Sequence, residues 1–235
     1  MRELFTNKRR LAVAVIAAAL VLFAAVFFMG RGGQALPEIE ALPETGDIIE
    51  FGGYNWIVLD VQGDRALIIT EEIIGQRAYH IRDTWDILTW ESSDIRRYLN
   101  DDFYNRFTEQ ERRRIAETKV INDNYNPWFG EHGGNDTVDK IFLLSLDELV
   151  SYFGDSGQLA NKNHPDNEWW GFHDQYSDDR IAYNASCVLR GWWLRSPGVN
   201  EDHITNIRDD GGVCVDGLHA GFTSGGVRPA LWLYF

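Results

Sequence analysis

The chain has 235 residues and a formal net charge of -14, because 36 acidic residues outnumber 22 basic ones. Such an acidic surface repels nucleic acid and anionic lipid headgroups, so we expect no nucleic-acid partner and instead a neutral, cationic or metal-bridged one. The 9 Trp, 9 Tyr and 13 Phe residues supply bulky side chains for the core of one domain of about 190 residues.

The N-terminal segment is basic at its start and apolar afterwards. Residues 11–29 contain no charged side chain, and Arg2, Lys8, Arg9 and Arg10 precede them. A helix over this stretch rises about 28 Å, which is enough to cross the hydrocarbon layer of a bilayer. Lys and Arg beside a membrane span stay on the cytoplasmic side. The order of the chain therefore predicts a cytoplasmic N-terminus over 1–10, a transmembrane helix over 11–29, a linker over 30–45 and an extracytoplasmic domain over 46–235.

These segments predict a single-pass protein of the cell membrane, with most of the chain outside the cell. The alternative is a signal peptide cleaved near Gly33-Gln34-Ala35. A signal peptide has a shorter apolar core and small residues at its cleavage site, and this segment is a poor match on both counts. We therefore expect an uncleaved anchor.

The domain begins with a predicted β-hairpin. Residues 51–60 and 65–70 are rich in β-branched and aromatic side chains, as strands are. Gln62-Gly63-Asp64 lies between them and suits a tight turn.

Three helices are predicted after the hairpin, each from a cap at its N-terminus. The serines of Trp90-Glu-Ser-Ser93 begin a helix within 90–99, and Thr108 and Glu111 have the spacing of a capping box. That second helix should run to about residue 117. Ser145 begins the third helix, which should end near residue 153, and a buried strand is expected just before it over 140–144.

The second half of the domain is predicted to consist of a long polar loop and then strands. Residues 154–179 are rich in Asn, Asp, Gly and His, and a loop of this length is usually functional or mobile. Asp209-Asp-Gly-Gly212 suits a hairpin turn, and Pro229 indicates an edge position or a bulge in the last strand. The expected strands cover 187–195, 203–208, 213–216 and 226–235.

Four residues of these strands have predicted structural roles. Trp192 and Trp193 should point to opposite faces of their strand, because side chains alternate along it. Arg195 and Arg228 are costly to bury alone, so inside the domain a carboxylate or a ring of carbonyl groups must hold each of them.

Cys187 and Cys214 are the only thiols of the chain. An oxidising exterior would permit them to pair, and the disulfide would close a loop of about 27 residues, worth roughly 3 kcal/mol in favourable geometry. We predict that disulfide. Two buried free thiols are the alternative.

Aromatic side chains inside polar loops are the candidate ligand contacts. Trp169, Trp170, His173 and Tyr176 lie within the long loop, and Trp128 lies in a second amide-rich stretch over 122–129. Exposed rings beside Asn, Asp and Gln stack on sugar rings or protein partners and form hydrogen bonds with them. The alternative is that these rings fold back to cover the sheet.

Several phrases of the chain together resemble a bacterial domain family of unknown function that is common in surface proteins of gut Firmicutes. They span about residues 46–235, nearly the whole predicted outer part. The phrases are GYNWIVL over 53–59, WESS over 90–93 with Leu99-Asn100, DKIFLLS over 139–145, WWLRSPG over 192–198 and GVRPALWL over 226–233.

The last two phrases also resemble the C-terminal part of the C-type-lectin-like fold, which formylglycine-generating enzymes share with retroelement-diversified binding proteins. This resemblance implies an α+β domain, with two or three helices beside a small twisted antiparallel sheet. Long loops would then supply a binding face.

No catalytic residue and no metal site are predicted. Formylglycine-generating enzymes use a closely spaced pair of copper-binding cysteines, whereas Cys187 and Cys214 are far apart in sequence. P-loop, GxSxG and GxGxxG motifs are absent. Carboxylates and histidines of the long loop leave calcium open as a cofactor, but they match no ligand template, and the sugar-binding Glu-Pro-Asn and Gln-Pro-Asp tripeptides of C-type lectins are absent. These loop residues are His164, Asp166, His173, Asp174, Asp178 and Asp179.

Together these features predict a membrane-anchored bacterial surface protein. Its outer domain should be a non-catalytic recognition or scaffold module that binds glycan or another surface protein. Two alternatives stay open: a structural or regulatory membrane anchor, and an enzyme whose site matches no known motif.

Overall fold

The computed structural model describes residues 42–81, 88–122, 126–188 and 190–235. The predicted membrane span over 11–29 lies outside these residues, as does the predicted linker up to residue 41. Among the helices that are described, none is long and apolar enough to cross a membrane.

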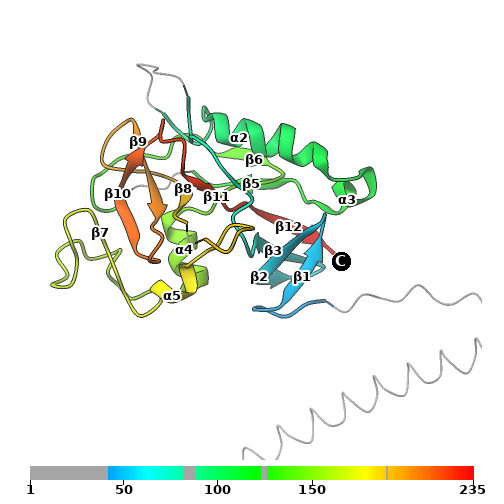
Figure 1. Cartoon of the computed structure of the whole chain (residues 1–235), viewed down its shortest axis with the longest axis horizontal. Coiled ribbons are helices and arrows are strands. Elements are labelled where there is room, and N and C mark those ends of the chain that lie inside the picture. The colour runs from blue at the N-terminus through cyan, green and yellow to red at the C-terminus, as the bar shows by residue number, and fades with distance from the viewer. Residues whose placement is uncertain (1–41, 82–87, 123–125, 189) are drawn as a thin grey trace, which may run out of the picture. The chain divides into compact units, whose positions relative to one another are not determined.

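A four-stranded antiparallel sheet joins the first and last strands of the domain (Figure 1). The predicted hairpin is confirmed, because its two strands pair across Gly63. The fourth strand pairs with the second member of that hairpin through five residues. In the order β1-β2-β3-β12, the strands are β1 (Ile48–Phe51), β2 (Tyr54–Gln62), β3 (Arg65–Thr70) and β12 (Ala230–Tyr234).

A mixed six-stranded sheet forms the other half of the fold. Its central strands follow one another as an antiparallel meander, and the predicted turn at Asp209 lies between two of them. One neighbouring pair, β11 with β8, is parallel. In the order β4-β11-β8-β9-β10-β7, the strands are β4 (Gly75–Gln76), β11 (Gly226–Val227), β8 (Trp192–Pro197), β9 (His203–Ile207), β10 (Val213–His219) and β7 (Gly171–Phe172).

The chain crosses between the two sheets at Arg228 and Pro229, which separate β11 from β12. β12 is the last strand in the order of the four-stranded sheet, as the edge position predicted from Pro229 requires, but single bridges to Ile115 and Phe142 lie along its other side. Phe51, Trp56, Ile68 and other apolar residues of this sheet are buried in one continuous core with those of β8 and β9.

The predicted helix caps are confirmed. Ser93, Thr108 and Ser145 each accept a backbone N–H bond, and the last two form complete capping boxes. The helices are α2 (Asp94–Tyr98), α3 (Glu109–Arg114), α4 (Leu146–Phe153) and α5 (Ser177–Arg180), and α2 continues into a π-helical turn (Leu99–Phe103) and a 3-10 turn (Tyr104–Arg106).

Two predictions near these helices were wrong. The second helix, α3, ends at Arg114 and not near 117, because Ile115 is extended and bridges to Leu233 of β12. Residues 141–144 are buried, yet the predicted strand over 140–144 forms only a single bridge, between Phe142 and Ala230. The short ladder in this region is instead β5 (Thr118–Val120) with β6 (Thr137–Asp139).

Arg195 of β8 ties four parts of the core together. Its guanidinium is 1% exposed and donates to both carboxylate oxygens of Glu148 in α4. It also donates to the carbonyl oxygens of Leu143 at 2.6 Å and Ile121 at 3.1 Å, and to the side-chain oxygen of Asn122 at 3.1 Å. Carboxylate and carbonyl groups thus hold this arginine, as the sequence predicts.

Arg228 is held differently. Its Nε donates to the Thr70 carbonyl oxygen at 2.9 Å, and its guanidinium lies 5.0 Å from the centre of the Trp192 ring. Burial lowers the pKa of Arg228 to about 10, which still leaves it charged at neutral pH. One carbonyl group and an aromatic face therefore hold Arg228 in place of the expected carboxylate or ring of carbonyl groups.

Replacing Arg195 with Met should lower the free energy of unfolding by about 3 kcal/mol, because the carbonyl groups and Glu148 would lose their buried donor. Urea unfolding measures this loss. Arg113→Met is the matched control, since Arg113 is 75% exposed in its ion pair with Glu109 and should leave the unfolding midpoint nearly unchanged. Equal stability of Arg195→Met and the parent protein would contradict the central role of this guanidinium.

Candidate functional site

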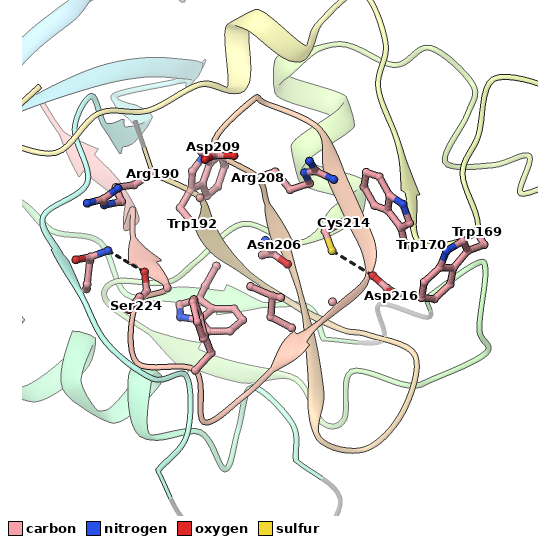
Figure 2. Close-up of a pocket in the computed structure, with 17 residues that line it drawn as sticks. Trp169, Trp170, Arg190, Trp192, Asn206, Arg208, Asp209, Cys214, Asp216 and Ser224 are labelled. Carbon is pink, nitrogen blue, oxygen red and sulfur yellow. Dashed lines mark hydrogen bonds between the residues drawn. The ribbon is translucent and has the colours of Figure 1, made fainter. Parts of the chain in front are cut away.

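A cavity of about 780 Å³ lies over one face of the six-stranded sheet (Figure 2). Its floor comes from β8, β9 and β10, and its rim comes from the segments that precede β7 and β11. Cavities of roughly 300 to 1,000 Å³ are typical of sites for small ligands.

Strand register decides which side chains face this cavity. Trp193, Asn206 and Cys214 lie opposite one another on β8, β9 and β10. Because side chains alternate along strands, these three share the cavity face of the sheet. The alternate residues Ile207 and Val213 are fully buried in the core on the other face.

The two tryptophans of β8 have separate environments, as their predicted opposite faces require. Trp192 contacts Phe153 of α4 and donates from Nε1 to the Arg180 carbonyl oxygen at 3.0 Å. Trp193 contacts Tyr79 and donates from Nε1 to the Arg77 carbonyl oxygen at 2.9 Å. Both rings are fully buried, so they support the site and leave stacking on a ligand to other residues.

Asn206 places an unused hydrogen-bond acceptor at the cavity floor. The residue is only 4% exposed, and its Nδ2 donates to the Ile207 carbonyl oxygen at 3.2 Å. Its Oδ1 is buried and accepts from no residue that the structure describes. A buried acceptor without a donor costs free energy, and a ligand that supplies the donor recovers it.

Cys214 is adjacent to Asn206 and is not activated. Its Sγ donates to Asp216 Oδ1 at 3.1 Å. Burial, followed by the hydrogen bond and negative charge of Asp216, raises the pKa of the Cys214 thiol to about 12. The thiol therefore stays protonated at neutral pH and is a poor nucleophile.

The predicted disulfide between Cys187 and Cys214 is wrong, because both cysteines are free. The prediction assumed that both lie on neighbouring strands. In the structure β8 begins only at Trp192, and Cys187 is exposed in a turn where Asn184 Oδ1 accepts from Ser186 N and Val188 N. Cys214 lies within β10 and is buried.

Trp169 and Trp170 form one side of the rim, as Figure 2 shows. The Trp170 carbonyl oxygen accepts from Val215 N at 2.8 Å and from Asp216 N at 2.9 Å, which fixes this part of the long loop to β10. Trp169 is 75% exposed. The structure thus brings together two of the five predicted ligand contacts.

The other three predicted contacts do not line the cavity. His173 lies behind the rim, with its ring against Trp170 and its Nε2 3.5 Å from Asp210. Tyr176 packs so closely on Gly154 that a Cβ there would overlap the ring. Trp128 is 6% exposed and donates from Nε1 to the Leu159 carbonyl oxygen, so it lies in the core.

Several cavity residues were missed by the sequence analysis: Asn206, Arg208, Asp216, Leu218, Phe222 and Ser224. A signal was present for two of them. Asn206 and Asp216 are polar residues of the predicted strands 203–208 and 213–216, and Asp216 directly follows the apolar run Val213-Cys214-Val215. The pairing of the strands was needed to show that they share a face.

Asp174 and Arg180 anchor the loop that carries the rim tryptophans. Arg180 Nη1 donates to Asp174 Oδ1 at 2.8 Å, Nη2 donates to Oδ2 at 3.1 Å, and both side chains are at most 1% exposed. Burial alone would raise the pKa of Asp174, but hydrogen bonds from Arg180 and Ser156 and the charge of Arg180 outweigh it and lower this pKa. Among the described residues, no three His, Cys, Asp or Glu side chains form a group suited to a metal ion.

Comparison with known proteins gives one match. Residues 63–235 match a family described as a domain of unknown function (DUF6273). No curated protein and no solved structure matches the chain.

A thiol reagent at pH 8 should label one cysteine quickly and the second only after unfolding. Cys187 is exposed and reacts first, whereas Cys214 is buried with a pKa of about 12. Absorbance during labelling counts the reactive thiols, and Cys187→Ser should remove the fast phase. Labelling that requires a reductant would instead reveal a disulfide.

Asp174→Asn should lower the free energy of unfolding by about 3 kcal/mol at pH 7, because Arg180 would stay buried without its carboxylate. Since the folded pKa of Asp174 lies below the usual value of 3.8, its contribution is complete above that value and is lost as the pH falls through the folded pKa. The stabilities of variant and parent should therefore converge in acid. A constant difference down to acidic pH, measured by urea unfolding, would contradict this ion pair.

Proposed function

The chain belongs to the DUF6273 family of domains of unknown function, and we propose that the domain is a non-catalytic recognition module that binds a glycan in the cavity over the six-stranded sheet. The observation that carries the proposal is the exposed indole of Trp169 at the rim of a cavity with a polar floor. Sugars have apolar ring faces and polar edges, so one such site binds both parts.

The chemistry of the cavity favours binding over catalysis. With its pKa raised to about 12, the Cys214 thiol stays protonated at neutral pH. A thiol nucleophile is activated by a lowered pKa, whereas burial and the neighbouring Asp216 raise the pKa of Cys214. Cys214 is therefore not the activated nucleophile that an enzyme of the thiol type would need.

Two further parts of the proposal concern fold type and location. The GVRPA and WWLRSP segments lie side by side through the pairing of β11 with β8 at Gly226 and Trp192, which supports the C-type-lectin-like classification, although this pair is parallel and the resemblance implies an antiparallel sheet. The apolar stretch over 11–29 supports a membrane anchor with the cavity outside the cell, where glycans are available.

A surface protein is the second candidate ligand. Leu218 and Phe222 line the cavity and are 36% and 47% exposed, so they extend the apolar rim beyond what one sugar ring covers. Exposed apolar side chains that cluster around a pocket are typical of protein contacts. A purely structural or regulatory anchor would leave this cavity unused.

Trp169→Ala should weaken glycan binding about tenfold, because the exposed indole supplies the stacking surface. A glycan array identifies the bound sugars, and calorimetric titration of the strongest binder measures the affinity. Tyr234→Ala is the matched control, since Tyr234 is also an exposed aromatic residue but lies on β12 of the other sheet.

Thermal unfolding of both variants separates binding from folding. Trp169 is 75% exposed, so its removal should leave the melting temperature close to that of the parent. Unchanged affinity in Trp169→Ala, or loss of the fold, would refute the role given to this ring.

A further inference from the structure

We propose that the cavity floor selects an amino sugar with a free, protonated amine, and that Asn206 and Asp216 bind its ammonium group. This inference rests on the proposed glycan-binding function and names the chemical class of the sugar. The inference concerns selectivity among sugars. Trp169 alone does not provide that selectivity, because an indole stacks on any sugar ring.

The first observation is the acceptor on Asn206. Its Nδ2 is engaged by the Ile207 carbonyl oxygen, which leaves Oδ1 as the group available to a ligand. This oxygen is buried and accepts from no described residue, within a side chain that lines the cavity. A ligand that supplies a hydrogen-bond donor would therefore satisfy this oxygen.

The second observation is the carboxylate of Asp216. It is half-buried at the cavity, accepts from Cys214 Sγ and forms no ion pair with any residue in the described part of the chain. Cys214 is paired with Asn206 across the strands and lies two residues from Asp216 on β10. In Figure 2 these three side chains follow one another across the floor.

A neutral sugar would cover this carboxylate without compensating its charge. Removal of water from an ionised carboxylate costs several kcal/mol unless an opposite charge or several donors replace the water. An ammonium group supplies a positive charge and three N–H donors, one for Asn206 Oδ1 and the others for Asp216. A hydroxyl group supplies a single donor and no charge.

The arginine next to this floor is already engaged. Arg208 donates to Asp210 at 3.0 Å, and its guanidinium lies over the Trp170 ring, 4.5 Å from the centre. Its contacts with Asp210 and Trp170 therefore engage Arg208 away from Asp216. The other arginine of the cavity lining, Arg190, comes from the segment that precedes β8. The acidic net charge of -14 acts in the same direction, because it favours approach of a cationic ligand.

Three matched oligosaccharides test the selection. Tetramers of β-1,4-linked glucosamine, N-acetylglucosamine and glucose share a backbone and differ only at C2, which carries an ammonium, an acetamide or a hydroxyl group. Calorimetric titration of the full chain in detergent gives the three affinities. The glucosamine tetramer should bind at least about tenfold more tightly than either analogue.

Substitutions then test whether residues of the cavity floor cause the preference for glucosamine. Asp216→Asn should lower the affinity for the glucosamine tetramer about tenfold and leave the affinity for the glucose tetramer nearly unchanged, and Asn206→Leu should act in the same direction. Asp64→Asn is the control for a general loss of negative charge, because Asp64 is exposed in the β2–β3 turn. Thermal unfolding identifies any variant that has lost the fold, and Asp216→Asn is the conservative one of the two.

The outcomes separate the two proposals. Equal binding of all three tetramers through Trp169 would overturn the ammonium inference and keep the glycan-binding function. Binding of no tetramer, together with an empty glycan array, would overturn both. If Asp64→Asn abolished the preference for glucosamine as fully as Asp216→Asn does, the preference would come from nonspecific charge attraction. That result would refute the site on the cavity floor.

Discussion

One buried guanidinium holds the parts of this domain in register. Arg195 connects β8 with α4 through Glu148, with the 140–144 segment through Leu143, and with the chain before β6 through Ile121 and Asn122. These segments share no regular ladder in the described part of the chain, although the backbone N–H of Arg195 also donates to the Leu144 carbonyl oxygen at 2.9 Å. A buried charge tolerates few arrangements, because any displaced partner leaves a desolvated group unpaired. The position of β8, and hence of the sheet that follows from it, depends on this constraint.

The cavity exists because one face of the six-stranded sheet packs on the core and the other face is only partly covered. Trp192, Ile207 and Val213 occupy the core face, and Trp193, Asn206 and Cys214 occupy the other. Trp193 is covered by the segment around Arg77, but that cover does not extend over Asn206 and Cys214. The long loop completes the rim because the Trp170 carbonyl is bonded to β10 and the Asp174–Arg180 pair fixes its far end. An acceptor and a carboxylate are thus left at the base of an aromatic rim, which is the arrangement that the proposed glycan site requires.

Local features were predictable where a few neighbouring residues decide them. The Ser93, Thr108 and Ser145 caps and the β2–β3 hairpin depend on contacts within about five residues. Predictions failed where a distant partner decides the outcome. Ile115 leaves its helix to meet Leu233, and Cys187 lies in a turn because β8 starts later than the apolar pattern suggests. The aromatic loop residues were grouped by composition alone, which does not distinguish the exposed Trp169 from the buried Trp128.

The sequence by itself determined the α+β composition, the capped helices, the need for partners at Arg195 and Arg228, and the family to which the domain belongs. The sequence also indicated Trp169 and Trp170 as candidate ligand contacts, because aromatic residues are uncommon in a polar loop. Only the tertiary structure decided that Asn206 and Asp216 share one floor with Cys214, and that the two cysteines stay apart. The physical reason is that a face of a sheet is defined by the register of strands far apart in the chain. Periodicity within one strand says which residues alternate, but not which face is covered.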